Sequence, residues 1–552
     1  MAVETAIAAD HLHADPALWI ARRPDHVLRA EAVRLAAEGP RGRPLWGTVF
    51  AVKDNIDVAG LATTAACPAY AFRPEASAPA VARLVEAGAL VMGKTNLDQF
   101  ATGLVGTRSP HGTPRNLFSP AHVPGGSSSG SAVAVGAGIV RFALGTDTAG
   151  SGRVPAAFAN IVGLKPTRGL IPTAGVVPAC RSLDTVSIFA ASVDEALAVA
   201  RIAAGGASCL ARAALPPTWR LAVAAVAPLC APEVARACEA AAAVAPETIT
   251  IDATALLEIA RLLYDGPWVA ERTAALREFL ARAPVTIHST TRAILEAGHA
   301  RTAVDAFAAF HRLAEVRTEV AAMFAGCDAL LLPTAPFCPT LAEDAADPFG
   351  HNRRLGTFTN FCNLLDLAAF AVPAGFGADG LPVGVMLLGP ARSEATLAPI
   401  ADFLHRRLAT TIGATGLPLP PAAPPDTLAP GEIALFCLGA HMAGLALNGE
   451  LRLLGARFLR PARTAPCYRL FDLGDRPGLL RDGAGAAIAG ELWALPRDSL
   501  GALLSPSASP IGLGAIALDS GPAVGFLVEA AAVASAPEIT ALGGWRARLA
   551  QR

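Results

Sequence analysis

Residues 122–158 read HVPGGSSSGSAVAVGAGIVRFALGTDTAGSGRVPAAF, so an apolar run is enclosed between two clusters of glycine and serine. A flexible linker has no reason to continue directly into AVAVGAGIV, because an apolar run of this kind is buried in a folded protein. We therefore predict two buried loops that one buried element holds in place, rather than two surface turns. Glycines let such loops approach a bound molecule closely and aim N–H groups at it, and serines supply nucleophiles. The phosphate-loop pattern G-x-x-x-x-G-K-[ST] does not occur here.

The composition excludes several classes of function. Hydrophobic residues make up 53% of the 552 residues and charged residues 16%, so the chain can bury a large core and is not expected to be disordered. Lys plus Arg number 45 and Asp plus Glu 46, a balance that argues against nucleic acid or a membrane as partner. The ten cysteines show neither C-x-x-C pairs nor zinc spacing, so we expect reduced thiols and no metal site. No signal peptide is visible, and we expect a cytoplasmic protein.

A proline-rich stretch divides the chain. Residues 416–432, GLPLPPAAPPDTLAPGE, contain six prolines, which cannot sustain a helix or a central strand and indicate a semi-rigid linker. We therefore predict a long domain over residues 1–415 and a small domain over residues 433–552.

Short apolar runs alternate with helical patterns in the long domain. PLWGTVFAVKD and ALVMGKT are typical of strands, APAVARLVEAG of the helix between them, and DALLLPTAP and GLPVGVMLLGP of later strands. This alternation indicates an α/β fold with a mixed, mostly parallel sheet that helices cover on both faces. After the linker, five runs predict a small sheet or barrel with little helix: EIALFCLG, APCYRLFDLG, AIAGELWALP, IGLGAIAL and GPAVGFLVEA.

Lys53 directly follows an apolar strand pattern, at the end of GTVFAVK. Partial desolvation of a lysine at such a place disfavours the ammonium and lowers its pKa, so that the neutral amine can act as a general base. Taken alone, this residue is weak evidence for catalysis, because most lysines at such a place extend to solvent or pair with a carboxylate.

Four stretches carry a family resemblance: GTVFAVKDNIDVAG, GKTNLDQFATG, PGGSSSGSA and GTDTAGSGRVPAAFANIVGLKPTRG. With them, most of residues 40–405 resembles the amidase signature hydrolases. The resemblance implies an α/β fold with a central mixed sheet and a Ser–cis-Ser–Lys triad. Placed on this sequence, Lys53 is the base, Ser127 the bridging serine after a cis peptide bond, and Ser151 the nucleophile. We expect no cofactor.

The resemblance also implies an oxyanion hole made of backbone N–H groups. On this sequence its donors are Thr148, Ala149, Gly150 and Ser151, which together hold the negative charge that develops on the substrate carbonyl oxygen. Ala149 departs from the family, where many members have glycine. We expect the hole to survive if Ala149 keeps a negative φ.

The stretch LLYDGPWVAER, residues 262–272, narrows the substrate. With TNFCNLLDLAAFAVPAG, it resembles the allophanate hydrolase branch of the family, in which the equivalents of Tyr264 and Arg272 bind the carboxylate end of allophanate (urea carboxylate). A paired hydrogen bond from an arginine to a carboxylate suits this anion, which carries a primary amide at its other end. The alternative is a surface helix whose arginine is solvated. Broader amidases acting on biuret, malonamate or neutral amides stay open.

The small domain resembles the extra domain of allophanate hydrolases, whose fold is like that of γ-glutamyl cyclotransferases, a small α+β barrel. In that branch the domain is linked to decarboxylation of N-carboxycarbamate, the product of the amidase step. His441, in GAHMAG, is the candidate proton donor. A structural histidine, in a domain that serves only dimerisation or assembly, is the alternative.

Partner expectations follow from the same resemblance. We expect a homodimer that is coupled to a separate urea carboxylase, because no biotin-attachment Met-Lys motif occurs in the chain. Membership of a tRNA-linked amidotransferase complex is a weaker alternative, since the balanced charge and the appended domain both argue against it.

Overall fold

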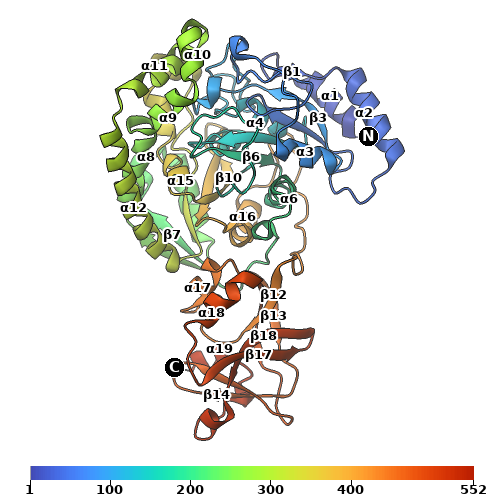
Figure 1. The fold of residues 1–552 in the computed structure, drawn as a ribbon, viewed down its shortest axis with the longest axis vertical. Coiled ribbons are helices and arrows are strands. Elements are labelled where there is room, and N and C mark those ends of the chain that lie inside the picture. Colours follow the sequence, from blue (N-terminus) through green and yellow to red (C-terminus); the bar gives the residue numbers. More distant parts are fainter. Residues whose placement is uncertain (1, 552) are drawn as a thin grey trace.

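The computed structural model describes residues 2–551, which form a larger part that contains an 11-stranded sheet and a smaller C-terminal part that contains a 5-stranded sheet (Figure 1). In sheet order, the strands of the larger part are β1 (Trp19–Arg22), β3 (Leu90–Thr95), β2 (Val49–Lys53), β4 (Phe142–Asp147), β6 (Thr185–Ala190), β5 (Val162–Lys165), β10 (Ala368–Phe376), β11 (Pro382–Gly389), β9 (Ala329–Pro333), β7 (Arg220–Ala224) and β8 (Glu247–Ile251). The α/β class is confirmed.

The helices of the larger part cover both faces of this sheet (Figure 1). They are α1 (Ala2–His13), α2 (Asp25–Glu38), α3 (Pro79–Glu86), α4 (Ser129–Gly136), α5 (Val154–Phe158), α6 (Val193–Ala204), α7 (Pro232–Ala243), α8 (Thr254–Asp265), α9 (Trp268–Ala275), α10 (Arg277–Arg282), α11 (Ser289–Ala297), α12 (Ala303–Ala325), α13 (Leu341–Ala346), α14 (Gly350–Leu355), α15 (Asn360–Leu364) and α16 (Glu394–Leu408). None of these helices, nor any other in the described chain, is long and apolar enough to cross a membrane.

The alternation of side chains along β2 shows how the two faces are filled. Phe50 and Val52 join the apolar cluster that includes residues of α3 and α6. Val49 and Ala51 point to the opposite face and join the cluster that includes residues of α1, α2 and α4. Both sets are buried, as a strand covered on both faces requires.

The expectation of a mostly parallel sheet is wrong. Among the described strands of the large sheet, β2, β3 and β4 are parallel neighbours, and so are β7, β8 and β9. The six pairings that remain, including all of those in the middle of the sheet, are antiparallel. The reason is visible at β10 and β11, which form a hairpin over residues 377–381, and a short loop of this kind joins only antiparallel strands.

The apolar run that separates the two glycine–serine clusters forms a buried helix followed by a buried strand. All residues of α4 are buried, and so are all residues of β4. The first cluster therefore lies at the start of α4, and the second lies between the end of β4 and the start of α5. This arrangement agrees with the predicted pair of buried loops.

In the smaller part, each of the five predicted runs contains a strand. Its sheet has the order β13 (Arg457–Arg463), β16 (Ala489–Pro496), β12 (Glu432–Cys437), β18 (Gly521–Val528) and β17 (Ile511–Leu518), and β14 (Tyr468–Asp472) pairs with β15 (Pro477–Arg481). Its helices are α17 (Asn448–Leu453), α18 (Leu500–Leu504) and α19 (Trp545–Leu549). Sequence analysis missed β13, where Pro461 interrupts the pattern. This proline is tolerated because β13 is an edge strand.

Residues 416–431 of the predicted linker contain no helix or strand, and β12 begins at Glu432. The segment lies along α6. The N–H of Ala423 donates to Asp194 at 2.8 Å, and Arg201 donates to Asp426 at 2.7 Å. The linker is therefore fastened to the larger part by charged groups.

Candidate active site

Lys53 ends β2, and its side chain is buried. The ammonium nitrogen Nζ donates to Ser127 Oγ at 2.8 Å and to Thr146 Oγ1 at 2.8 Å. Ser127 follows the cis peptide bond that joins it to Gly126, directly before α4. The structure thus brings together two of the predicted site residues, Lys53 and Ser127, which are 74 positions apart in the sequence.

Burial lowers the pKa of the Lys53 ammonium to about 7. The negative charges of Asp98, Asp147 and Asp184 oppose this effect and keep the pKa from falling further. At neutral pH, about half of the molecules therefore carry the uncharged amine. Lys53 is poised to accept a proton under physiological conditions.

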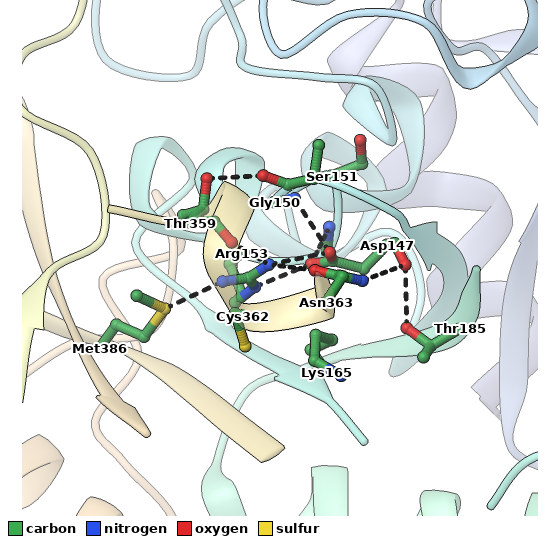
Figure 2. A network of polar contacts seen from close by, with 12 residues as sticks. Asp147, Gly150, Ser151, Arg153, Lys165, Thr185, Thr359, Cys362, Asn363 and Met386 are labelled. Carbon is green, nitrogen blue, oxygen red and sulfur yellow. Dashed lines mark hydrogen bonds and ion pairs between the residues drawn. The ribbon is translucent and has the colours of Figure 1, made fainter. Parts of the chain in front are cut away.

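Ser151 lies in the second loop, between β4 and α5, and is buried (Figure 2). Its Oγ donates to the carbonyl oxygen of Gly103 at 3.5 Å, and it makes no hydrogen bond to Ser127 within the described residues. The two serine loops nevertheless contact consecutive residues of a third segment, because the N–H of Gly126 donates to the carbonyl oxygen of Leu104 at 2.9 Å and Ser151 contacts Gly103. The hydroxyl of the proposed nucleophile is thus oriented toward Gly103 rather than toward Ser127.

A buried ion pair holds the second loop (Figure 2). Arg153 donates from Nε and Nη2 to the two oxygens of Asp147, both at 2.9 Å. Asp147 Oδ2 also accepts the N–H of Gly152 at 2.9 Å. Burial by itself would raise the pKa of Asp147, but the guanidinium of Arg153 holds it below its usual range. Sequence analysis did not single out this pair, although Asp147 and Arg153 are the first and last residues of the stretch DTAGSGR.

Helix α15 and the residue before it support the same loop and also accept hydrogen bonds from Arg153 (Figure 2). Asn363 Nδ2 donates to the carbonyl oxygen of Asp147 at 2.9 Å, and Thr359 Oγ1 donates to the carbonyl oxygen of Ala149 at 2.6 Å. A Cβ on Gly150 would lie 2.4 Å from Thr359 Oγ1, and Gly150 has φ +132°. Glycine is therefore required at position 150, whereas Ala149 has no positive φ.

The predicted oxyanion donors need one correction. The N–H of Gly150 donates to Asp147 Oδ1 at 2.9 Å and is therefore already engaged inside the loop. The N–H groups of Thr148, Ala149 and Ser151 have no partner among residues 2–551. Three N–H groups, rather than four, remain available to an oxyanion.

Asp184 fixes the first of these three donors. Thr148 Oγ1 donates to Asp184 Oδ1 at 2.5 Å, and the same carboxylate accepts the N–H groups of Ala179 and Cys180 at 3.0–3.2 Å. Burial raises the pKa of Asp184 to about 6. Sequence analysis missed Asp184, because nothing in the local pattern CRSLDTV marks it as a partner of the loop at Thr148.

Arg272 lies on α9 and is only 1% exposed, so the alternative of a solvated surface arginine is excluded. Its Nη1 donates to Thr102 Oγ1 at 3.2 Å, and its guanidinium carbon lies 5.0 Å from the ring centroid of Tyr264 on α8. Arg272 Nε, Arg272 Nη2 and the Tyr264 hydroxyl have no hydrogen-bond partner in the described chain. No carboxylate of the described chain lies within ion-pair distance of the guanidinium. The charges of Asp184 and Glu271 act on it from further away and raise the pKa of Arg272, against the effect of burial.

One loop joins this cation to the nucleophile. Thr102 accepts from Arg272, and the next residue, Gly103, accepts from Ser151. Arg272 and Ser151 thus contact consecutive residues, although 121 positions separate them in the sequence.

His441 lies in the smaller domain and is not brought to the serine loops. It lines a cavity of about 430 Å³ together with Glu450, Arg476 and Phe526. Its ring stacks on Phe526 with 5.5 Å between centroids and 8° between planes. Burial lowers the pKa of His441, and the charge of Glu450 opposes this effect. Among residues 2–551, no three His, Cys, Asp or Glu side chains are arranged to hold a metal ion.

Two family models match the chain. The model named Amidase matches residues 11–217 and 223–398. The model named Allophanate hydrolase C-terminal domain matches residues 433–550.

Curated relatives include the urea amidolyases of Saccharomyces cerevisiae and Lachancea kluyveri, each 40% identical, over 95% and 87% of this chain. The chain spans only about 30% of the length of these two relatives. A glutamyl-tRNA(Gln) amidotransferase subunit of Nitratidesulfovibrio vulgaris is 34% identical, over 69% of this chain and 88% of that protein.

Solved structures of related proteins also match the chain. Kluyveromyces lactis urea amidolyase matches with a TM-score of 0.79 and 36% identity, over 100% of this chain and 36% of that one. Selenomethionine-substituted Kluyveromyces lactis allophanate hydrolase matches with a TM-score of 0.77 and 36% identity, over 100% of this chain and 97% of that one.

Proposed function

Because the chain belongs to the amidase family, we propose that it hydrolyses the carboxamide of allophanate and releases ammonia. One observation carries the choice of substrate: Arg272 is a buried cation with two nitrogens, Nε and Nη2, that lack partners in the described chain. A substrate carboxylate would satisfy both nitrogens and the nearby hydroxyl of Tyr264. The similarity to an allophanate hydrolase over the whole chain supports the same substrate.

In the proposed mechanism, Lys53, Ser127 and Ser151 act as one relay. Neutral Lys53 accepts the proton of Ser127 across their 2.8 Å hydrogen bond. Ser151 turns its hydroxyl from Gly103 to Ser127, gives up its proton and attacks the amide carbon. The proton returns through Ser127 to the departing ammonia, and water then hydrolyses the acyl-enzyme.

The N–H groups of Thr148, Ala149 and Ser151 stabilise the oxyanion in this mechanism. Because the loop is fixed before the substrate arrives, these dipoles need no reorganisation during the reaction. The loop is held by the Asp147–Arg153 ion pair and by the hydrogen bond from Thr148 to Asp184.

The experiment that tests the substrate compares allophanate with biuret, which is uncharged and also carries a primary amide. Allophanate hydrolysis predicts a much higher kcat/KM for allophanate, and this preference should disappear in Arg272→Ala. Equal kcat/KM values for the two substrates in the wild-type protein would favour the alternative, an amidase of broad specificity for biuret, malonamate or neutral amides.

For the smaller domain, we propose that it promotes decarboxylation of N-carboxycarbamate, with His441 as the proton donor to the departing nitrogen. The match to the allophanate hydrolase C-terminal domain and the cavity at His441 support this role. The lowered pKa of His441 makes its imidazolium a stronger acid, and it also leaves less imidazolium at neutral pH, so proton donation by His441 should be fastest in mildly acidic solution. The alternative, a domain that serves only assembly, predicts the same products at the same rates with and without the domain.

We also propose a cytoplasmic homodimer that is coupled to a separate urea carboxylase. Three large apolar side chains, Val304, Phe307 and Phe310, are exposed on one helix, α12, and offer a surface for a second copy. The ten cysteines are free, which suits a reducing compartment. The urea amidolyases to which the chain is similar extend far beyond the matched region, which leaves room for a further activity on their chain. Light scattering of the purified protein tests the dimer.

A further inference from the structure

The loop over residues 98–103, DQFATG, connects three parts of the candidate site. The N–H of Asp98 donates to the carbonyl oxygen of Ser127 at 3.1 Å. At the other end of the loop, Thr102 accepts from Arg272 and Gly103 accepts from Ser151. The loop therefore contacts the guanidinium, the nucleophile and the bridging serine.

The Asp98 carboxylate fixes the start of the loop. Its two oxygens accept the N–H groups of Gly106 and Arg108, each at 3.0 Å. A Cβ on Gly103 would lie 2.5 Å from Asp98 Oδ2, so the backbone folds closely over the carboxylate. These contacts tie the start of the loop to its end and to residues 106–108.

Phe100 anchors the middle of the loop. Its ring packs against Tyr70 and Phe279, with centroids 5.3 and 5.7 Å apart, and its N–H donates to the carbonyl oxygen of Ala65 at 3.0 Å. Phe100 and Ala101 adopt φ values of +53° and +52°, which non-glycine residues rarely do. Such a backbone persists only where surrounding contacts enforce it, and it is characteristic of functional sites.

The hydroxyl of Thr102 is oriented toward Arg272 by its own hydrogen bond. Its single proton is donated to the carbonyl oxygen of Phe100 at 3.1 Å. A threonine hydroxyl has one proton and two lone pairs, so the oxygen presents a lone pair to Arg272 Nη1. Arg272 is held by this one hydrogen bond, and its other nitrogens remain available to a ligand.

We propose that Thr102 is a positioning residue that holds Arg272, and that the Thr102–Gly103 step sets the length of the substrate. Consecutive Cα atoms are about 3.8 Å apart, so the residues that Arg272 and Ser151 contact on this loop are offset by a single step of the chain. This offset suits monoanions with one atom between the carboxylate carbon and the carboxamide carbon, such as allophanate and malonamate. It disfavours succinamate, which has two. The inference rests on the proposed amidase activity toward short anionic amides.

The test compares Thr102→Val and Thr102→Ser with the wild-type protein, using malonamate and succinamate and measuring ammonia release. Thr102→Val keeps the shape of the side chain and removes the acceptor, whereas Thr102→Ser keeps the acceptor. Thr291→Val is the matched control, because Thr291 on α11 is equally buried and its hydroxyl has no partner in the described chain.

We expect Thr102→Val to raise KM for malonamate at least about tenfold, with kcat changed less than about threefold, because a hydrogen bond to a charged group is lost. Thr102→Ser and Thr291→Val should stay within about threefold of the wild-type KM. The wild-type preference for malonamate over succinamate should shrink in Thr102→Val.

Two results would overturn the inference while leaving the proposed function intact. The first is a fall in kcat with KM unchanged in Thr102→Val. The second is a wild-type protein that hydrolyses malonamate and succinamate equally well. Failure of the proposed function looks different: the folded wild-type protein would release no ammonia from allophanate or malonamate at all.

Discussion

Replacing Lys53 with methionine tests how the fold keeps a general base neutral. The fall of the lysine pKa from 10.5 to about 7 on burial corresponds to about 5 kcal/mol by which the folded state disfavours the ammonium. Below pH 7 the lysine is charged in both states, so the wild-type protein bears this whole cost. Between pH 7 and 10.5 the folded lysine is neutral while the unfolded lysine still binds a proton, and the cost falls to zero as pH rises.

Methionine is neutral at every pH, so residue 53 makes no pH-dependent contribution to the stability of Lys53→Met. The variant also loses the hydrogen bonds of Lys53 to Ser127 and Thr146. Each lost bond reduces the gain in stability by about 1 kcal/mol. We expect the variant to be the more stable protein at pH 7. Its advantage should shrink by about 1.4 kcal/mol for each pH unit above 7. Lys94 and Lys165, whose pKa values burial also lowers, are present in both proteins and cancel.

The assay is urea unfolding of both proteins at pH 7, 8 and 9, followed by circular dichroism. Parallel stability curves, with a constant difference between the two proteins, would refute the assignment of a depressed pKa to Lys53. The same pKa predicts that wild-type kcat/KM rises about tenfold per unit below pH 7 and levels off above it, since only the neutral amine is a base. A flat profile from pH 5 to 9 would contradict a lysine base.

Five further changes probe the rest of the site and the smaller domain. Ser151→Ala should abolish ammonia release, and adding a change at the base should cost little more, because residues of one relay are not additive; full additivity in the double variant would contradict the relay. Arg272→Ala should raise KM for allophanate at least about thirtyfold, from a loss on the order of 2–5 kcal/mol, with little effect on biuret. Tyr264→Phe should weaken allophanate binding by about 1 kcal/mol, because one hydrogen bond is lost. Equal losses of Arg272→Ala on allophanate and biuret would show that the arginine has only a structural role. Truncation after Gly431 should leave ammonia release intact but lengthen the lag before the second ammonia, and His441→Ala should behave in the same way. Stopped-flow measurement of ammonia and carbon dioxide checks this, and identical lags would favour an assembly role for the smaller domain.

The sequence predicted the parts of the site that local motifs encode. Lys53, Ser127 and Ser151 each lie within a recognisable stretch, and the structure joins the first two directly. It could not predict Asp184 or Thr102, because their roles depend on side chains far away in the chain: Thr102 meets its arginine 170 positions later. Such contacts arise from packing and leave no local pattern.

The strand directions show the same limit. The apolar runs in the sequence identified the central strands. The composition of such a run does not determine which strand lies next to it or in which direction that neighbour runs. The antiparallel middle of the sheet therefore differed from the expectation. The prediction that the N–H of Gly150 donates to the oxyanion was wrong for a related reason. Whether its N–H is available depends on Asp147, whose orientation only the folded loop defines.

The fastening of residues 416–431 along α6 changes how an intermediate would pass between the two domains. A chain of this length behaving as a random coil would span about 22 Å on average and would let the smaller domain wander. Here Asp426 binds Arg201, and Arg457 of the smaller domain donates to the carbonyl oxygen of Arg212 in the larger one. The path between the serine loops and the cavity at His441 then has a constant length. The transit time depends on solute diffusion rather than on domain reorientation. Viscosity of the medium, and not the stiffness of the tether, would therefore govern the handover.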